Sequence, residues 1–350
     1  MKLCTSSLSL ALLGCSSIAS QTSFVMAQEI NTLCKSASYE FNGGTEAESF
    51  MGHSVSITND GSLIASGEPG HNNGQGRVGL LSRDDTSSAD SPSSWTSRWI
   101  TGPSPLAKFG YHTSLSGNGK WLAVGAPLDQ GTTNVMSGSV TLYQVDQYSS
   151  NFGLPFQKLT GERTSVSGWD WFGFKTALSH SGDVLVTTAP FSFSETLDEV
   201  GAMEVYRRAG DEDEDDDKFQ LLGVAYGENR GENLGYDVAL SDDGSMLVVS
   251  SPYAETSDLT YYEGKVSIYE INANALLKIQ TIWGEGSTQL LGFKGLALSK
   301  SANRLAINSH GFGRFKGQVT FYELDDSTTS TETKQYAQIG DILEGSNSGT

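Results

Sequence analysis

The chain of 350 residues contains five histidines, the side chains best suited to act as general bases or metal ligands near neutral pH. His53 and His112 both follow a glycine that begins a repeated segment, and we assign them to equivalent positions of two repeats. Repeated placement favours a structural role. His71, His180 and His310 stand in expected turns or loops, without a partner at the spacing of a His-x-x-x-His metal site. The histidines therefore predict neither a catalytic base nor a metal centre.

Other catalytic signals are also absent from the sequence. It contains no Gly-x-Ser-x-Gly nucleophile elbow and no phosphate-binding P-loop. The uninterrupted acidic run at 211–217 is interpreted as a solvated loop, with a weak cation or mineral-surface contact as the alternative. We accordingly expect no enzymatic activity and no cofactor.

Aromatic residues gather in two kinds of expected loop, those joining strands two and three of a repeat and those joining strand four to the next repeat. These loops emerge on one face. Aromatic rings there suit contact with a protein or a glycan, and packing between neighbouring repeats is the alternative. The candidate binding residues are Trp169, Trp171, Phe191, Phe193, Tyr253, Tyr261 and Tyr262.

Five similar segments occupy most of the chain. Their first glycines, 57 to 63 residues apart, are Gly52, Gly110, Gly173, Gly235 and Gly292. Each segment contains an alternating strand, a turn rich in Asx and Gly, and a continuous apolar strand that ends near a proline. A third strand of the form Gly-x-apolar-x-apolar-Tyr and a fourth strand follow.

Four antiparallel strands cannot bury both faces of their sheet alone, whereas radial stacking of such sheets can. The period of about 60 residues therefore predicts an all-β fold, a β-propeller of four-stranded blades. Five repeats are visible, and an incomplete sixth blade is the alternative. Two segments compete to close the ring, Ser38–Phe41 before the first repeat and Gln335–Ile339 after the last.

The pair Phe109-Gly110, followed by Gly125-Ala126-Pro127, resembles the FG-GAP blades of integrin α-subunit propellers and related secreted repeat proteins. The resemblance implies a calcium loop of the type Asp-x-Asp-x-Asp-Gly in many blades. Here the corresponding turn is short and offers two carboxylates at most, Asp242 and Asp243, whereas calcium takes six to eight oxygen ligands. We therefore predict no metal site, with calcium as the alternative.

The fifth repeat departs from the pattern. Ala302 replaces the turn glycine, one residue is inserted, and Asn308-Ser309-His310 stands where the Gly-Ala-Pro motif is expected. Terminal repeats are commonly atypical because they cap the array. We interpret this segment as a capping blade.

The first residues predict export. Lys2 precedes a short apolar run, and small residues offer cleavage sites after Ala19 or Ala27. We expect a signal peptide at 1–27, a single propeller domain at 28–350 and no membrane insertion of the mature chain. Lipid anchoring at Cys15 fits the lipoprotein pattern poorly. Cys34 is then the one cysteine of the mature chain, so no internal disulfide is expected.

The formal net charge of −19 repels nucleic acid and anionic membranes. Together, these features predict a secreted, non-catalytic module that presents loops on a propeller face to an extracellular protein or glycan. A propeller enzyme acting on glycans is one alternative. An acidic, cation-binding extracellular or wall-associated protein is the other.

Overall fold

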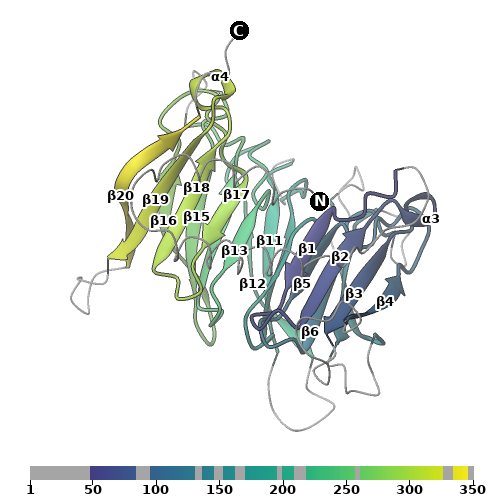
Figure 1. Ribbon diagram of the computed structural model, residues 1–350. Helices are drawn as coiled ribbons and strands as arrows, with labels where there is room; N and C mark the ends of the chain where they lie inside the picture. Colours follow the sequence, from purple (N-terminus) through teal and green to yellow (C-terminus); the bar gives the residue numbers. More distant parts are fainter. Residues whose placement is uncertain are drawn as a thin grey trace, which may run out of the picture. The chain divides into compact units, whose positions relative to one another are not determined.

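The computed structural model describes nine stretches of the chain, all of them with β-strands, turns or short helices (Figure 1). The described residues are 48–83, 95–130, 136–145, 153–161, 170–194, 199–208, 218–256, 261–325 and 334–345. The expected signal peptide, Cys34, the segment Ser38–Phe41, Trp169 and the acidic run at 211–217 lie outside them.

The strands form five four-stranded antiparallel sheets, each from consecutive strands. The first blade contains β1 (Ser54–Ile57), β2 (Leu63–Glu68), β3 (Arg77–Arg83) and β4 (Trp95–Thr101), and the second β5 (His112–Leu115), β6 (Trp121–Ala126), β7 (Ser139–Gln144) and β8 (Pro155–Thr160). The third contains β9 (Thr176–Leu178), β10 (Val184–Ala189), β11 (Ala202–Arg208) and β12 (Phe219–Tyr226). The fourth contains β13 (Val238–Leu240), β14 (Met246–Ser251), β15 (Lys265–Ile271) and β16 (Leu276–Trp283), and the fifth β17 (Leu291–Leu298), β18 (Arg304–Ser309), β19 (Gln318–Asp325) and β20 (Gln335–Glu344).

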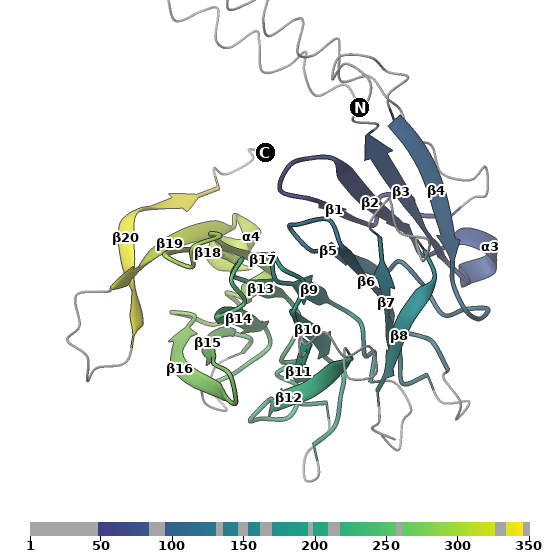
Figure 2. The same ribbon diagram turned by 90° about the horizontal axis from the view of Figure 1, so that it is seen from below.

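The sheets are arranged as propeller blades, which confirms the predicted fold. The first strands of successive blades lie side by side toward the centre, β1 against β5, β5 against β9, β9 against β13 and β13 against β17 (Figure 2). Four clusters of buried side chains fill the four joints between successive blades. The core is therefore formed between blades, where each sheet buries its faces against its neighbours.

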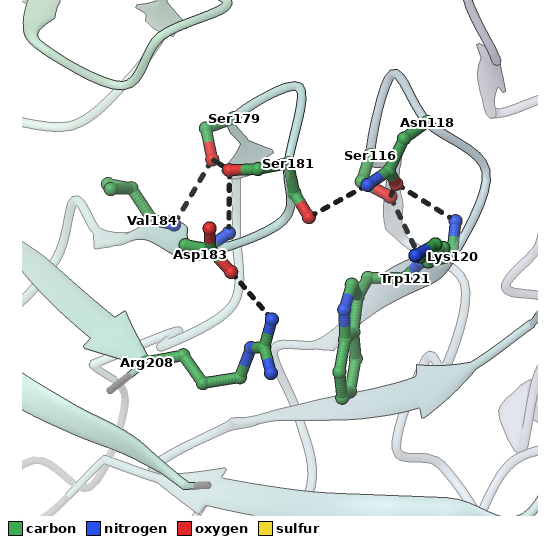
Figure 3. Close-up of polar contacts among 9 residues, drawn as sticks. All are labelled: Ser116, Asn118, Lys120, Trp121, Ser179, Ser181, Asp183, Val184 and Arg208. Atoms are coloured by element: carbon green, nitrogen blue, oxygen red, sulfur yellow. Dashed lines mark hydrogen bonds and ion pairs between the residues drawn. The ribbon is translucent and has the colours of Figure 1, made fainter. Parts of the chain in front are cut away.

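The turn between the first two strands is stabilised by its own side chains (Figure 3). In the second blade the Ser116 hydroxyl donates to Oδ1 of Asn118 (2.7 Å) and accepts from the backbone N–H of Trp121 (2.9 Å). Ser179 and Ser181 make the corresponding contacts in the third blade. Nδ2 of Asn118 also donates to the carbonyl of Ser181 (3.1 Å), so the turns of neighbouring blades are joined.

The two halves of the FG-GAP-like motif meet at the joints. Phe109 is fully buried, and its backbone forms a parallel bridge with Gly76 of the preceding blade. Gly110 has a φ of 84° and donates its N–H to the carbonyl of Gly125 in its own blade (3.1 Å). A Cβ on Gly67 of the preceding blade would stand 1.9 Å from the Gly110 carbonyl oxygen. The motif is therefore explained by close contact between blades.

The outer face of the first blade is incompletely covered. Val55 and Ile57 of β1 are 63% and 57% exposed, whereas Thr113 and Leu115, which occupy the same positions in β5, are 2% and 7% exposed. The side chains of β5 are covered by the first blade, whereas those of β1 have no comparable cover among the described residues. We call the region between the fifth and first blades the seam.

The surface of the fifth blade that borders the seam also has apolar side chains that are only partly covered. Ala306 and Phe321 are cross-strand partners on β18 and β19, and both are half-buried. Their equivalents in the fourth blade, Val248 and Ile268, are fully buried against the fifth blade. At the seam, the fifth blade therefore presents apolar side chains whose equivalents are buried at the other four joints. The first blade presents Val55 and Ile57, which are far more exposed than their equivalents in the second blade.

The C-terminal candidate for the closing strand lies in the fifth blade. β20 pairs with β19 as its fourth strand, and the described residues form five blades. The other candidate, Ser38–Phe41, lies outside the described residues, so its role and the incomplete sixth blade stay predictions. Ala302 adopts a φ of 59° at the turn position where the fourth blade has Gly244, which agrees with its expected place.

The helices of the described residues are single turns in loops, α3 (His71–Gly74) and α4 (Phe312–Phe315). In the part of the chain that is described, no helix has the length and apolar character needed to cross a membrane.

Candidate functional site

One aromatic or imidazole ring from each blade lines the centre of the loop face. The rings follow the first glycine of each repeat, and they are His53, Tyr111, Phe174, Tyr236 and Phe293. Successive ring centroids lie 4.5, 5.4, 5.5 and 4.9 Å apart, from the first blade to the fifth. We call this set the aromatic arc. Because it repeats in every blade, packing explains its presence.

The predicted equivalence of His53 and His112 is wrong. His53 occupies the place of Tyr111 in the arc, and the two rings are in contact. His112 is cross-strand partner to Gly125, as Ser54 is to Gly67, so its equivalent is Ser54. The error arose because one residue, Tyr111, separates His112 from its glycine.

His112 has a structural role at the joint between the second and third blades. Its Nδ1 accepts the backbone N–H of Thr176 (3.2 Å), which requires an unprotonated nitrogen. Burial lowers the pKa of His112 to about 3, and the positive charge of Lys175 acts in the same direction. The imidazole is therefore neutral at physiological pH.

The third and fourth blades have further aromatic residues on this face in addition to the one ring that each blade contributes to the arc. Trp171 contacts Tyr111 (centroids 6.1 Å apart) and Phe191 (5.1 Å), while Tyr253 contacts Tyr236 (5.7 Å) and Tyr262 (5.4 Å). The residue after the proline breaker is aromatic in these two blades, Phe191 and Tyr253, and glycine or leucine in the first two. Four of the predicted binding residues thus form one continuous surface with the arc.

The other two predicted binding residues in the described chain, Phe193 and Tyr261, have no ring contact with the aromatic arc. Phe193 is half-buried, and its carbonyl accepts the Ser192 hydroxyl. Tyr261 is 60% exposed and pairs through its backbone with Ser287. Neither lines the pocket described next, and their binding role stays a prediction.

A pocket of about 560 Å³ lies at the joint between the third and fourth blades. We call it the Tyr236 pocket. Its aromatic lining consists of Phe191, Tyr236, Tyr253 and Tyr262, and its charged lining of Glu199, Arg230 and Glu255. Sequence reasoning missed Tyr236 and the three charged residues. Tyr236 was identifiable from its position after the repeat glycine, whereas the charged residues stand at loop positions that no pattern marks.

Local backbone contacts shape the pocket. Glu199 accepts the backbone N–H of Gly231 through its carbonyl (3.1 Å), and the buried side chain of Asn233 donates to the Pro190 carbonyl (2.7 Å). These bonds join the two loops that form its wall. Burial raises the pKa of Tyr236, and the neighbouring Tyr253 adds to the effect. The Tyr236 hydroxyl therefore stays protonated, and a hydrogen bond with Tyr253 contributes to this.

The opposite end of the propeller axis carries a smaller polar group. Nδ2 of Asn59 lies 2.8 Å from Nδ1 of His180 and 3.2 Å from Oδ2 of Asp242, which joins the first blade to the third and fourth. Gly117 makes room, since a Cβ there would stand 2.3 Å from Nδ1 of His180. Among the described residues, no group of three or more His, Cys, Asp or Glu side chains is placed to hold a metal ion.

These observations define the class of protein as a β-propeller of five four-stranded blades. The solved structures that are similar to it include two at 13% identity. Hydrazine synthase of Kuenenia stuttgartiensis matches with a TM-score of 0.38 over 82% of this chain and 81% of that chain. The periplasmic gluconolactonase PpgL of Pseudomonas aeruginosa matches with a TM-score of 0.39 over 87% and 90%.

No family model matches the chain, and no curated protein does. The likeness to FG-GAP repeats is therefore one of motif, and membership of that family is not shown. Both of these structures are named as enzymes, which contradicts the expectation that this chain has no enzymatic activity, and that expectation is withdrawn. At this identity the likeness concerns the fold alone, so neither activity is transferred to this chain.

Proposed function

We propose that the chain binds a carbohydrate in the Tyr236 pocket. The observation that supports this most directly is the lining, in which four aromatic side chains and three charged ones converge on one hollow. A sugar ring has apolar C–H faces and a rim of hydroxyls. Aromatic walls suit the faces, and carboxylate, guanidinium and phenol groups suit the rim.

The dimensions favour a small ligand over a protein surface. The volume of about 560 Å³ falls in the range typical of pockets for small molecules, roughly 300–1,000 Å³. A standard protein interface instead buries about 800 Å² on each partner. The chain's net charge of −19 also disfavours strongly anionic ligands, so neutral glycans are preferred.

A second candidate function is cleavage of the bound glycan. Glu199 and Glu255 both line the pocket, and glycosidases commonly use two carboxyl groups, one as acid and one as base or nucleophile. This function requires binding first, so the two candidates are tested in order.

Adjacent tyrosines provide a matched test. Tyr262 is 47% exposed and lines the pocket, whereas Tyr261 is 60% exposed and does not. The mature protein is applied to an array of neutral and acidic glycans, together with Tyr262→Ala and Tyr261→Ala variants. We expect Tyr262→Ala to weaken binding at least tenfold and Tyr261→Ala to leave it within twofold. No bound glycan, or equal loss in both variants, would refute the proposal.

Cleavage is then tested on the glycans that bind. Wild-type protein and the variants Glu199→Gln and Glu255→Gln are incubated with each glycan, and products are separated by chromatography. Cleavage by the wild type that either substitution abolishes, with binding retained, would support the enzyme. Uncleaved glycan in every incubation would exclude it.

A further inference from the structure

A second pocket occupies an equivalent joint of the propeller. It measures about 570 Å³ and lies between the first and second blades, against Glu48, Phe50, Asn72, Asn73, Leu106 and Lys108. Lys108 stands two residues before the repeat glycine, as Asn233 does in the Tyr236 pocket, and Leu106 corresponds to Gly231. The two pockets therefore share two kinds of loop, the one before a repeat glycine and the one between strands two and three of the preceding blade. Glu48 and Phe50 add a further loop to the second pocket, whereas Tyr253, Glu255 and Tyr262 add a different one to the Tyr236 pocket. We call the second one the Lys108 pocket.

The joint between the second and third blades lies between the two pockets, and it has an indole side chain two residues before its repeat glycine. Trp171 is the equivalent of Lys108 and Asn233, two residues before the glycine of the third repeat. All three have positive φ, 58°, 59° and 53°, so the loop backbone is alike at the three joints. The first and third of these joints present polar groups in a pocket, and the middle one presents a large ring.

Ring contacts run from Tyr111, which lies beside the Lys108 pocket, to the Tyr236 pocket. Tyr111 follows Lys108 closely in sequence, and its N–H donates to the Lys108 carbonyl (3.0 Å). Tyr111 contacts Trp171 (6.1 Å), and Trp171 contacts Phe191 (5.1 Å), which lines the Tyr236 pocket. Tyr111, Trp171 and Phe191 are each half-buried, so part of each side chain faces solvent. The rings thus form a partly exposed row between two polar hollows.

We propose that the ligand is an oligosaccharide that extends from the Tyr236 pocket over Trp171 to the Lys108 pocket. This inference rests on the proposed function and specifies its substrate class as a glycan of several units. Aromatic rings in a row suit successive sugar rings, because each ring offers an apolar face and tolerates variation in the sugar. The pockets at the two ends supply the hydrogen-bonding groups that fix register and orientation.

The test is the dependence of affinity on chain length. Neutral oligosaccharides of one to six units, from the β-1,4-glucan, β-1,3-glucan and chitin series, are titrated into the mature protein by calorimetry. In the series that binds, we expect affinity to rise at least tenfold from the shortest bound oligomer to the hexamer. Equal affinity for all lengths would overturn the extended site and leave the Tyr236 pocket intact. No binding by any series would overturn both proposals.

A substitution at Trp171, in the middle of the row of rings, distinguishes loss of the extended binding site from a general loss of folded structure. Trp171→Asn introduces the residue found at the equivalent position 233, with similar φ, so the loop is expected to fold. We expect it to abolish the gain of the hexamer and to change the affinity of the shortest bound oligomer less than twofold. Lys108→Asn should weaken only the longer oligomers. A uniform loss at all lengths in Trp171→Asn would contradict the inference.

Discussion

A Cβ atom on Gly125 would stand 2.0 Å from the carbonyl oxygen of Gly173, although 47 residues separate the two glycines. Gly125 belongs to the second blade, and Gly173 begins the third. Between the first and second blades Gly67 and Gly110 show the same relationship, at 1.9 Å. The glycines of the motif are therefore required for close approach of neighbouring backbones.

Gly125→Ala is expected to destabilise the fold. The new methyl group meets backbone atoms, which cannot rotate away, so the blades must separate or the strand must shift. Overpacking of this kind costs about 1–3 kcal/mol, measured as the free energy of unfolding in denaturant. Gly286→Ala is the control, because nothing lies within 4 Å of its Cβ position. Equal stability of the two variants would show that the joint is looser than described.

The seam gives a second comparison between equivalent positions. Leu115 is 7% exposed and Ile57 57% exposed, although both stand five residues after their repeat glycine. Leu115→Ala should therefore lower the free energy of unfolding by about 2–5 kcal/mol, and Ile57→Ala by less than about 1 kcal/mol. Comparable losses in both variants would mean that the seam is covered in solution.

An ion network links the loop that leads into the fourth blade to its strands β15 and β16. Nζ of Lys265 lies 3.1 Å from Glu232 and 3.0 Å from Glu228, and the side chains of Lys265 and Glu232 are 2% and 1% exposed. A hydrogen bond from Lys278 and another from Lys265 lower the pKa of Glu228 to about 2. The network therefore holds the Glu228 carboxylate ionised.

Lys265→Met would leave Glu232 buried without its cation. Breaking a buried pair in this way costs about 3–5 kcal/mol, measured by denaturant unfolding at pH 7. The double variant Lys265→Met with Glu232→Gln should recover part of the loss, since no uncompensated charge remains. Additive losses from the two substitutions would contradict a direct interaction.

The pH dependence of stability tests the neutral state of His112. Its pKa is about 3 in the folded protein, below the ordinary value of 6.5, so below pH 6.5 the unfolded chain binds a proton that the native protein does not. Stability is therefore lost as pH falls from about 6.5 toward 3, with a slope of up to about 1.4 kcal/mol per pH unit.

His112→Ser, which introduces the equivalent residue of the first blade, is the variant for this measurement. It should lose less stability than the wild type between pH 7 and pH 5, as measured by denaturant unfolding at both values. The carboxylates contribute equally to both proteins and cancel in the comparison. Identical pH dependence would show that His112 is accessible to protons in the native state.

The repeat made the fold predictable. The spacing of the five glycines, the Asx-Gly turns and the buried second strands each follow from local rules, and together they specify four-stranded blades. The seam was not predictable, because the sequences of β1 and β5 differ little in hydrophobicity. Val55 and Ile57 are exposed through the position of their blade, which no local pattern encodes.

The aromatic part of the site was predictable from the sequence, and the charged part was not. Trp171, Phe191, Tyr253 and Tyr262 are aromatic residues that the repeat pattern places in loops, and Tyr236 follows the glycine of its repeat. Arg230 and Glu255 belong to different loops and line one pocket only in the folded chain. Sequence alone could not bring them together, since it gives no distance between loops of variable length.

The central claim is that a sugar occupies the Tyr236 pocket. A crystal structure of the protein with a glycan selected on the array tests it most directly. The account predicts density for a sugar ring between Tyr236, Tyr253 and Tyr262, with hydroxyls near Arg230 or Glu199. Density for the sugar at the opposite end of the axis, beside Asn59 and His180, with an empty pocket, would contradict it.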